Sequence, residues 1–224
     1  MTTTRPTDER LGCDTSDLIH VHQMFRRAFA DAPELVRGVR DGDARRTHVV
    51  AEHVREMAGW LHTHHQTEDE LLWDSLEQRS PGCALHVGLM RVQHASVAEL
   101  LDRLGGELEA WQREGTAPER DTVADTLAAL HAVLLAHLGD EEDRIVPTAQ
   151  TVLSQREWDQ LGEHSRSHVA RDRMLIQLGW LLDAIPPADR AVWLRANLPL
   201  PVRAIWRIVG ARKFAAHRAR VYGA

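Results

Sequence analysis

The sequence predicts an all-α protein built around an up-down bundle of four helices. Apolar residues recur at the three- and four-residue spacing of amphipathic helices almost throughout, and no segment alternates in the way a strand does. Breaks at residues 41–43, 80–82 and 115–118 separate four long helical stretches. Because short connections favour antiparallel neighbours, we expect these four stretches to pack together as one bundle.

The four expected helices follow one another within a predicted domain of residues 1–152. The first is defined by the spacing of Leu18, Ile19, Phe25 and Phe29. The second begins near Asp43, a suitable N-cap, and reaches about Gln78. The third runs on through Leu104, and the fourth is expected to end at Pro147, because proline lacks the backbone N–H that a helix interior needs.

Residues 153–224 are predicted to form a C-terminal helical extension that packs on or beside the bundle. Ser154 and Glu157 have the spacing of a capping box, so a fifth helix is expected to begin there and to end before Pro186. From Arg190 to the end the chain has eight basic residues and no acidic one. This basic tail is expected either to dock on the acidic body or to contact an acidic partner.

Composition narrows the class of protein. The chain has 43% hydrophobic and 27% charged residues and a formal net charge of −6, as in ordinary globular domains. We expect no membrane span, because no apolar run approaches the roughly 20 residues that cross a membrane, and residues 1–12 lack the apolar core of a signal peptide. With only Cys13 and Cys83 present, we expect no disulfide framework and a cytoplasmic location. Nucleic-acid binding would rest on the arginine-rich tail alone and is not expected.

Two segments each place a carboxylate four residues after a histidine. His64 precedes Glu68 in HHQTEDELLW, and His137 precedes Glu141 in HLGDEEDRIVP. Side chains at this spacing project from one helix face, so the imidazole and the carboxylate can reach a common ion. His64 shares its face with apolar residues such as Met57, which points Glu68 toward the core. An ionised glutamate facing a core is unfavourable unless it is paired or bound to a metal.

The first and third helices each add one inward histidine, His22 and His94. Either alone would more often be a core histidine than a ligand. Together with the two paired segments, however, they give every helix of the bundle an inward histidine. Six nitrogen and oxygen ligands without a cysteine favour iron, or manganese, over a closed zinc site.

This order of motifs resembles the hemerythrin HHE cation-binding family over roughly residues 14–150, and the extension is similar to those of actinobacterial members. The resemblance implies two iron ions joined by a bridging oxo or hydroxo group. It also implies four imidazole ligands and two bridging carboxylates, carried here by His22, His64, His94, His137, Glu68 and Glu141.

The third helix departs from the pattern of oxygen-carrying hemerythrin, which has a second histidine one turn from the first. Met90 and Ala98 stand four residues from His94, so one coordination position is expected to be vacant, filled by water or taken by His65. His65 shares a helix face with Asp69, which favours a surface or supporting role for it.

Other polar residues receive lesser roles. Asp69 and Glu142 directly follow the two glutamates and could orient a ligand imidazole. Arg26 and Arg91 lie near the site in sequence and could pair with its acids. His164 and His168 form a histidine pair on the fifth helix that we interpret as solvated, and His20 faces away from His22.

Three function classes stay open. The first is a non-haem diiron protein that binds oxygen, nitric oxide or peroxide as a sensor or scavenger. The second is a diiron enzyme that disproportionates peroxide or oxidises an organic substrate with oxygen. The third is a regulatory or interaction protein that the metal stabilises. A ferritin-like diiron site is disfavoured because the E-x-x-H motif is absent from the sequence.

Overall fold

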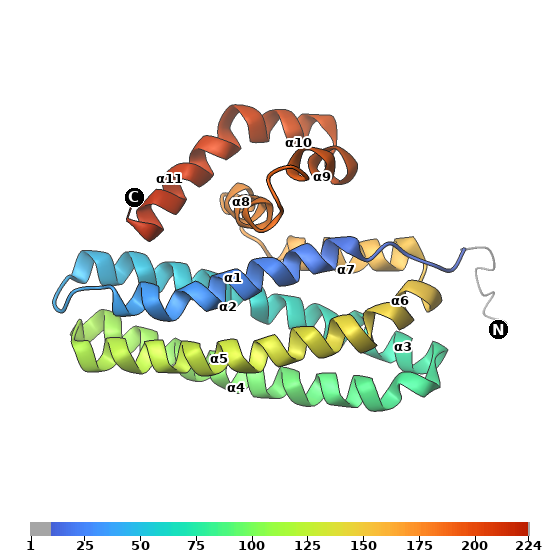
Figure 1. The fold of residues 1–224 in the computed structure, drawn as a ribbon, viewed down its shortest axis with the longest axis horizontal. Coiled ribbons are helices and arrows are strands. Elements are labelled where there is room, and N and C mark those ends of the chain that lie inside the picture. Colours follow the sequence, from blue (N-terminus) through green and yellow to red (C-terminus); the bar gives the residue numbers. More distant parts are fainter. Residues whose placement is uncertain (1–9, 224) are drawn as a thin grey trace, which may run out of the picture.

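The computed structural model describes residues 10–223, and its body is a bundle of four long helices that lie side by side (Figure 1). These helices are α1 (Ser16–Arg37), α2 (Ala44–Leu71), α4 (Ala84–Glu114) and α5 (Ala117–Arg144). Among residues 10–223 no strand is present; two isolated bridges join residues 11 and 12 to Ser154. The predicted all-α class is confirmed.

Local signals set the ends of the bundle helices. The side chain of Asp43 accepts a hydrogen bond from the backbone N–H of Arg46, so it caps α2 as predicted. Gly115 follows α4 with a φ of 69°, a left-handed conformation that glycine adopts without steric strain. Thr116 then adopts an extended conformation, and Pro118 lies in the first turn of α5.

The second predicted helix is interrupted near its end. α2 stops at Leu71, and the short helix α3 (Trp73–Arg79) continues it after Leu72. The backbone N–H of Leu72 still donates to the carbonyl of Glu68 at 2.9 Å. The expectation of one helix reaching Gln78 is therefore wrong in detail, although the chain stays helical.

The fourth predicted helix shows a similar break at Ile145. α5 ends at Arg144, and α6 (Val146–Val152) follows it, so Pro147 does not end the helical path. Pro147 stands in the first turn of α6, where its missing N–H would have no partner within the helix. The backbone N–H of Ile145 donates to the carbonyl of Glu141 at 2.9 Å.

α5 and α6 together also contain a stretch, Ala117–Val152, that is long and apolar enough to cross a membrane by length and composition. Core helices of bundles have the same length and composition, so this one helix is no clear membrane span, in agreement with the sequence expectation. In the structure α5 contributes Leu127, Leu130 and Leu134 to the buried core of the bundle. The apolar character of this stretch is thus explained by its packing against the other bundle helices.

The C-terminal region folds into further helices on one side of the bundle (Figure 1). The capping box of Ser154 and Glu157 is present at the start of α7. The predicted fifth helix is in fact two helices, because a turn at residues 168–173 separates α7 from α8. The elements are α7 (Gln155–Ser167), α8 (Met174–Ala184), α9 (Arg190–Asn197), α10 (Leu200–Ile205), a π-helical turn (Trp206–Gly210) and α11 (Ala211–Tyr222).

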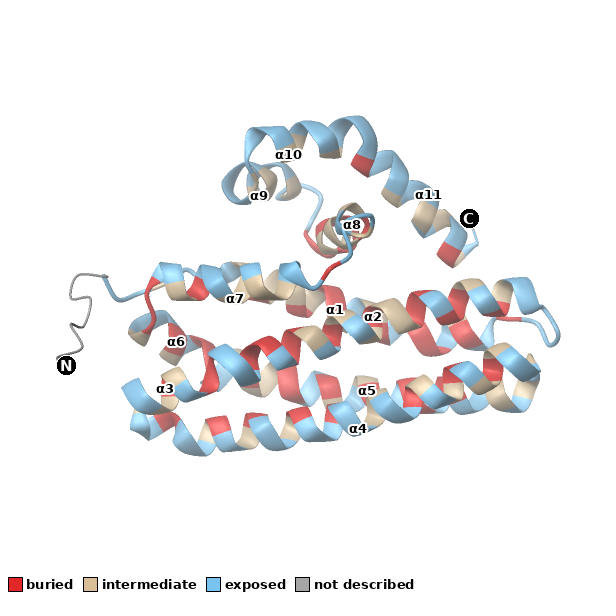
Figure 2. Cartoon of the chain, turned by 180° about the vertical axis from the view of Figure 1, so that it is seen from behind, coloured by how far each residue is buried: buried red, intermediate tan, exposed pale blue. Residues whose placement is uncertain are grey.

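The extension reaches the bundle through α7, α8 and α11. α7 packs on α2, α8 packs on α1, and α11 packs on both α8 and α2. Gly179 of α8 allows the closest approach, since a Cβ added there would lie 2.2 Å from the ring of Phe214 on α11. Figure 2 shows that α9 and α10 are mostly exposed, whereas α8 presents a buried face.

The bundle has two apolar clusters with a polar layer between them. The larger cluster includes Phe25, Leu61 and Val97, and it extends to residues of α8. The smaller cluster lies toward α3 and α6 and includes Trp73 and Met90. On each bundle helix, the predicted metal ligands fall between residues of these two clusters.

Candidate metal centre

All six residues predicted as metal ligands are buried and meet inside the bundle. α1 provides one histidine, α4 provides another, and α2 and α5 each provide a histidine and a glutamate. Their exposed fractions are between 0% and 8%. The six residues are His22, His64, Glu68, His94, His137 and Glu141.

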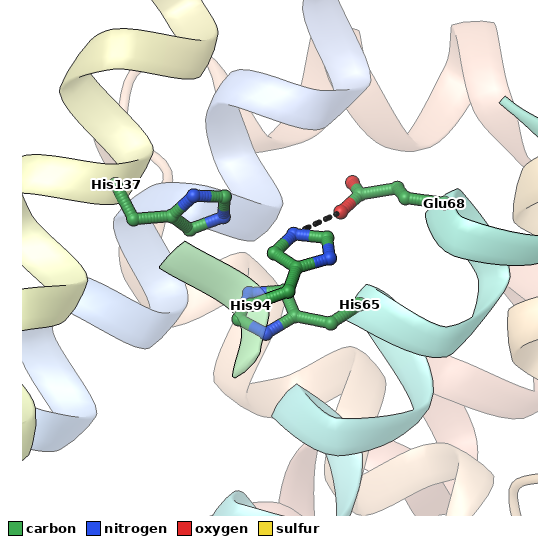
Figure 3. Close-up of side chains that lie close together, drawn as sticks. All are labelled: His65, Glu68, His94 and His137. Carbon is green, nitrogen blue, oxygen red and sulfur yellow. Dashed lines mark ion pairs between the residues drawn. The ribbon is translucent and has the colours of Figure 1, made fainter. Parts of the chain in front are cut away.

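The carboxylate of Glu68 lies between imidazoles from two helices. Its Oε1 atom is 3.2 Å from Nε2 of His64 on the same helix. Its Oε2 atom is 3.5 Å from Nε2 of His94 on α4 (Figure 3). The two oxygens of Glu68 therefore face different histidines, as a carboxylate shared by two ions would.

Glu141 occupies a comparable position on the other side of the centre. Its Oε2 atom is 3.4 Å from Nε2 of His22 on α1. The same oxygen is 3.6 Å from Nε2 of His137, one turn earlier on α5. Each glutamate thus joins a histidine of its own helix to a histidine of a neighbouring helix.

His65 is a seventh member of the centre, which corrects the expectation of a surface position. It is 5% exposed, and its ring stacks on that of His94 with centroids 4.1 Å apart (Figure 3). The adjacent His64 instead contacts the rings of His22 and Phe25 on α1. The two consecutive histidines of α2 therefore diverge, one toward α1 and one toward α4, and both stay buried.

The ligand atoms form two overlapping groups, within each of which they lie no more than 4.8 Å apart. One group consists of His22, His64, Glu68 and Glu141. The other consists of His65, Glu68, His94 and His137, the four side chains drawn in Figure 3. Glu68 belongs to both groups.

The polar atoms that point into this centre lack hydrogen-bond partners in the described part of the protein. Among the described residues, no hydrogen bond reaches Nε2 of any of the five histidines, Oε2 of Glu68 or either carboxylate oxygen of Glu141. A buried polar atom without a partner is destabilising, and seven neighbouring residues with such atoms are rarely tolerated. Cations bound among them would satisfy these atoms together, so the residues fit a metal centre. Five imidazoles and two carboxylates without a thiolate suit a first-row divalent ion.

Burial also sets the protonation of these side chains. It lowers the pKa of His64 and of His65 well below the usual value, and neighbouring histidines add to the effect. Both imidazoles are therefore neutral at pH 7, the form that binds metals. Burial raises the pKa of Glu68 well above its usual range, and the nearby Glu141 carboxylate raises it further.

Carboxylates behind the centre orient two of the imidazoles, as the sequence predicted for Asp69 and Glu142. Nδ1 of His94 lies 2.9 Å from Oδ1 of Asp69, and Nδ1 of His22 lies 2.8 Å from Oε1 of Glu142. Holding Nδ1 in this way fixes the ring and directs Nε2 toward the centre.

These two carboxylates are themselves held by further donors. Trp73 donates its indole N–H to Asp69 at 2.7 Å, and Arg26 donates to Glu142 at 2.6 Å. Although burial opposes it, hydrogen bonding to His22 and Arg26 lowers the pKa of Glu142 to about 2. Arg91, the other arginine considered, forms an ion pair with Asp74 on α3 instead.

One supporting residue was missed from the sequence. Gln93 lies with its Oε1 atom 3.2 Å from Nδ1 of His137, and its amide donates to Asp140 at 2.8 Å. In the sequence, the only hint of this role is that Gln93 directly precedes His94. Spacing along the helix does not show which residue a glutamine in this position contacts.

The remaining histidines considered from sequence lie outside the centre. His20 contacts Trp193 of α9. His164 and His168 lie at the surface, where the ring of His164 comes within 3.4 Å of a carboxylate oxygen of Glu70. These positions agree with the interpretation of all three as residues other than ligands.

A surface cavity of about 380 Å³ opens beside two residues of the centre, His65 and His94. It lies between α2 and α4, and Ala95 and Ala98 leave space on the α4 side. Its lining residues are His62, His65, Gln66, Asp69, Arg91, His94, Ala95, Ala98 and Leu101.

Comparison with known protein families gives a match to this architecture. The model of the hemerythrin HHE cation-binding domain matches residues 13–185, a range that contains every residue of the centre. The match continues beyond residue 152, where the sequence analysis placed the end of the bundle domain. No curated protein and no solved structure matches the chain. Because the family model covers well over half of its length, the chain belongs to the hemerythrin HHE cation-binding domain family.

Proposed function

We propose that this protein is a non-haem diiron protein that binds oxygen, nitric oxide or peroxide and acts as a sensor or scavenger. The observation that carries this proposal is the presence of two overlapping groups of ligand atoms that share Glu68. One cation would leave the ligand atoms of the other group without partners. Two cations would satisfy both groups, and iron is the metal that the family membership favours.

The geometry supports a specific division of the ligands. His22 and His64 would bind one ion, and His65, His94 and His137 would bind the other. Glu68 would bridge the ions through its two oxygens, and Glu141 would serve as the second bridging carboxylate. The position left open by Met90 and Ala98 would thus be filled by His65 rather than by water.

A pair of iron ions would supply a reversible change of oxidation state and coordination positions for a small ligand. The protein contributes the remaining conditions. Apolar layers on both sides of the centre exclude bulk water, and neutral imidazoles hold the ions without adding positive charge. The free cysteines Cys13 and Cys83 suit the reducing cytoplasm that we propose as its location.

The cavity beside His65 and His94 supports access by a small ligand from the surface. The same cavity is the observation that favours a second candidate function, the oxidation of a small organic molecule. Its lining includes Arg91, which could attract a substrate carrying a carboxylate. A sensor or scavenger needs no such substrate, so turnover separates these two functions.

Metal content and the visible spectrum test the proposal directly. The full chain would be loaded with ferrous iron without air and then exposed to oxygen, nitric oxide and peroxide in separate samples. We expect about two irons per chain, because the ligand atoms form two groups, and a ferric absorption spectrum after exposure to oxygen. Reversible bands would favour binding or sensing, and sustained loss of peroxide or of an added substrate would favour an enzyme. A chain that takes up no iron would refute the proposal.

A further inference from the structure

A second group of potential metal ligands lies between the bundle and the C-terminal extension. His53 and Glu56 stand one turn apart on α2, and His217 comes from α11. One ligand atom of each residue lies within 4.8 Å of the others. His217 falls outside the range matched by the family model, so this cluster is not a property of the matched domain.

Each of the two histidines has one buried ring nitrogen without a hydrogen-bond partner in the described part of the protein, although His217 as a whole is half-buried. His53 is 4% exposed, and its Nδ1 atom has no hydrogen-bond partner within residues 10–223. The buried Nε2 atom of His217 likewise has none in that range. Two unpaired nitrogens at one contact between helices indicate a ligand that accepts electron pairs from both.

Aromatic rings enclose this cluster. The ring of Trp180 on α8 lies 5.1 Å from that of His53 and 6.0 Å from that of His217, centroid to centroid. The ring of Tyr222 on α11 lies 6.4 Å from that of His53 and 6.0 Å from that of Trp180, centroid to centroid. These rings limit contact with solvent and favour ligands that bind an ion directly.

Charge at the cluster is compatible with one divalent cation. Burial lowers the pKa of His53 to about 3 and that of His217 to about 4, so both rings are neutral at pH 7. The guanidinium of Arg173 binds both oxygens of Glu56 at 2.5 Å and opposes a cation nearby. A carboxylate has about four lone-pair sites, so Glu56 can keep Arg173 and still bind a metal.

We propose that His53, Glu56 and His217 bind a zinc ion that fastens α11 to α2. Two imidazoles and one carboxylate form a recognised zinc ligand set, and a water molecule completes the tetrahedron. The proposal uses none of the seven residues of the bundle centre, and it stands whether or not that centre holds iron. The zinc would link the basic C-terminal region to the acidic body through one ion.

Zinc titration of the full chain tests this site. The bundle centre is first loaded with ferrous iron, and zinc binding is then followed by competition with a chromophoric chelator. We expect one further metal ion per chain in the wild type. His217→Gln should weaken zinc binding by at least about tenfold. Loss of a residue that orients a ligand typically costs about tenfold or more, and loss of a ligand itself should cost at least as much.

Two other variants distinguish this site from other histidine clusters that could bind zinc. His164→Ala removes one member of the surface pair His164 and His168, and it should leave zinc binding unchanged. His64→Ala impairs the bundle centre, and it should also keep the extra zinc. Zinc that disappears in His164→Ala, or that persists undiminished in His217→Gln, would overturn the proposal.

A spectroscopic measurement on the wild type covers the case in which His217→Gln fails to fold. Cobalt replaces zinc in the iron-loaded chain, and a four- or five-coordinate site gives intense visible bands that six-coordinate cobalt lacks. We expect those bands to appear with one equivalent of cobalt and to disappear when zinc is added. Their absence at saturating cobalt would refute the site.

Discussion

The rings of His65 and His94 stack with centroids 4.1 Å apart and an angle of 14° between their planes, although they come from different helices. Both Nε2 atoms are buried, and both residues belong to the same group of ligand atoms. Under the proposed occupancy, this pair would complete the centre without a second histidine on α4. His65 of α2 would then bind the same ion as His94 of α4.

Replacing His65 with alanine should therefore remove one of the two bound metals. We expect the affinity of one ion to fall by at least about tenfold, with the other ion retained by His22 and His64. Metal content after equilibrium dialysis measures this change. His62→Ala is the matched control, since His62 is exposed and lines only the neighbouring cavity. Equal metal content in the two variants would contradict the role of His65.

Removal of a predicted ligand at either end of the centre should have a larger effect. Glu141→Ala leaves the Nε2 atoms of His22 and His137 without their shared carboxylate, so we expect most of the bound metal to be lost. His64→Ala should also reduce metal content sharply. His164→Ala at the surface should not change it. Elemental analysis of the three purified variants measures their metal content. Equal metal content in all three would contradict the ligand assignment.

The carboxylate behind His94 should matter less than the ligands but more than surface acids. Asp69→Ala removes the acceptor that holds Nδ1 of His94. We expect metal affinity to fall by about 10–100-fold, the usual range for such supporting residues. Glu70→Ala, at the exposed neighbouring position, serves as the control. An affinity unchanged in Asp69→Ala would show that His94 is oriented by its packing alone.

The contact between α8 and α11 should be sensitive to a single methyl group. Gly179→Ala would place a Cβ 2.2 Å from the Phe214 ring, and we expect a loss of about 1–3 kcal/mol from overpacking. Gly59→Ala on α2 meets nothing within 4 Å and should stabilise the helix by about 0.5–1 kcal/mol. Urea unfolding of both variants measures these opposite signs. Destabilisation by both would mean that crowding at Phe214 is not the cause.

The capping box of α7 should give a defined pH dependence. A hydrogen bond from Arg79 lowers the pKa of Glu157 to about 2 from an ordinary value near 4.5, although burial opposes this. Because the folded-state pKa is depressed, the stabilisation is complete above about pH 4.5 and is lost as the pH falls toward 2. The stability gap between wild type and Glu157→Gln should therefore shrink from pH 6 to pH 3 in urea unfolding experiments. The control is Glu163→Gln, at an exposed position of α7. A stability difference that stays constant with pH, or that equals the difference for Glu163→Gln, would show that the Glu157 carboxylate is not its cause.

The bundle and six members of its centre could be predicted because they depend on local spacing. His64 and Glu68, one turn apart beside apolar neighbours, identify an inward face without any tertiary information. The same reasoning misplaced His65, because a helical wheel puts it about 100° from His64 and cannot show that both directions lead into the core. The structure resolves this through the different partners of the two rings on α1 and α4.

Contacts between distant segments could not be predicted. His53 and His217 meet only because α11 returns across α2, and no periodicity in the sequence encodes that path. The breaks at Leu72 and Ile145 were also missed, since neither position is a glycine or a proline. At Pro147 a helix end was predicted where the structure has the first turn of α6. A proline is compatible with the first turn of a helix, so it marks a helix start as readily as a helix end.

The breaks after α2 and α5 belong to two segments with the same order of residues. His64, Glu68 and Leu72 follow one another at four-residue steps, and His137, Glu141 and Ile145 repeat that series. Asp69 and Glu142 extend the correspondence, since each orients an imidazole of another helix.

Among the ligand positions of the two segments the correspondence fails once, where His65 corresponds to the buried Leu138. Under the proposed occupancy this single difference gives one ion three imidazoles and the other two. The two halves of an otherwise repeated site are then electronically unequal, so the ions would be oxidised at different potentials.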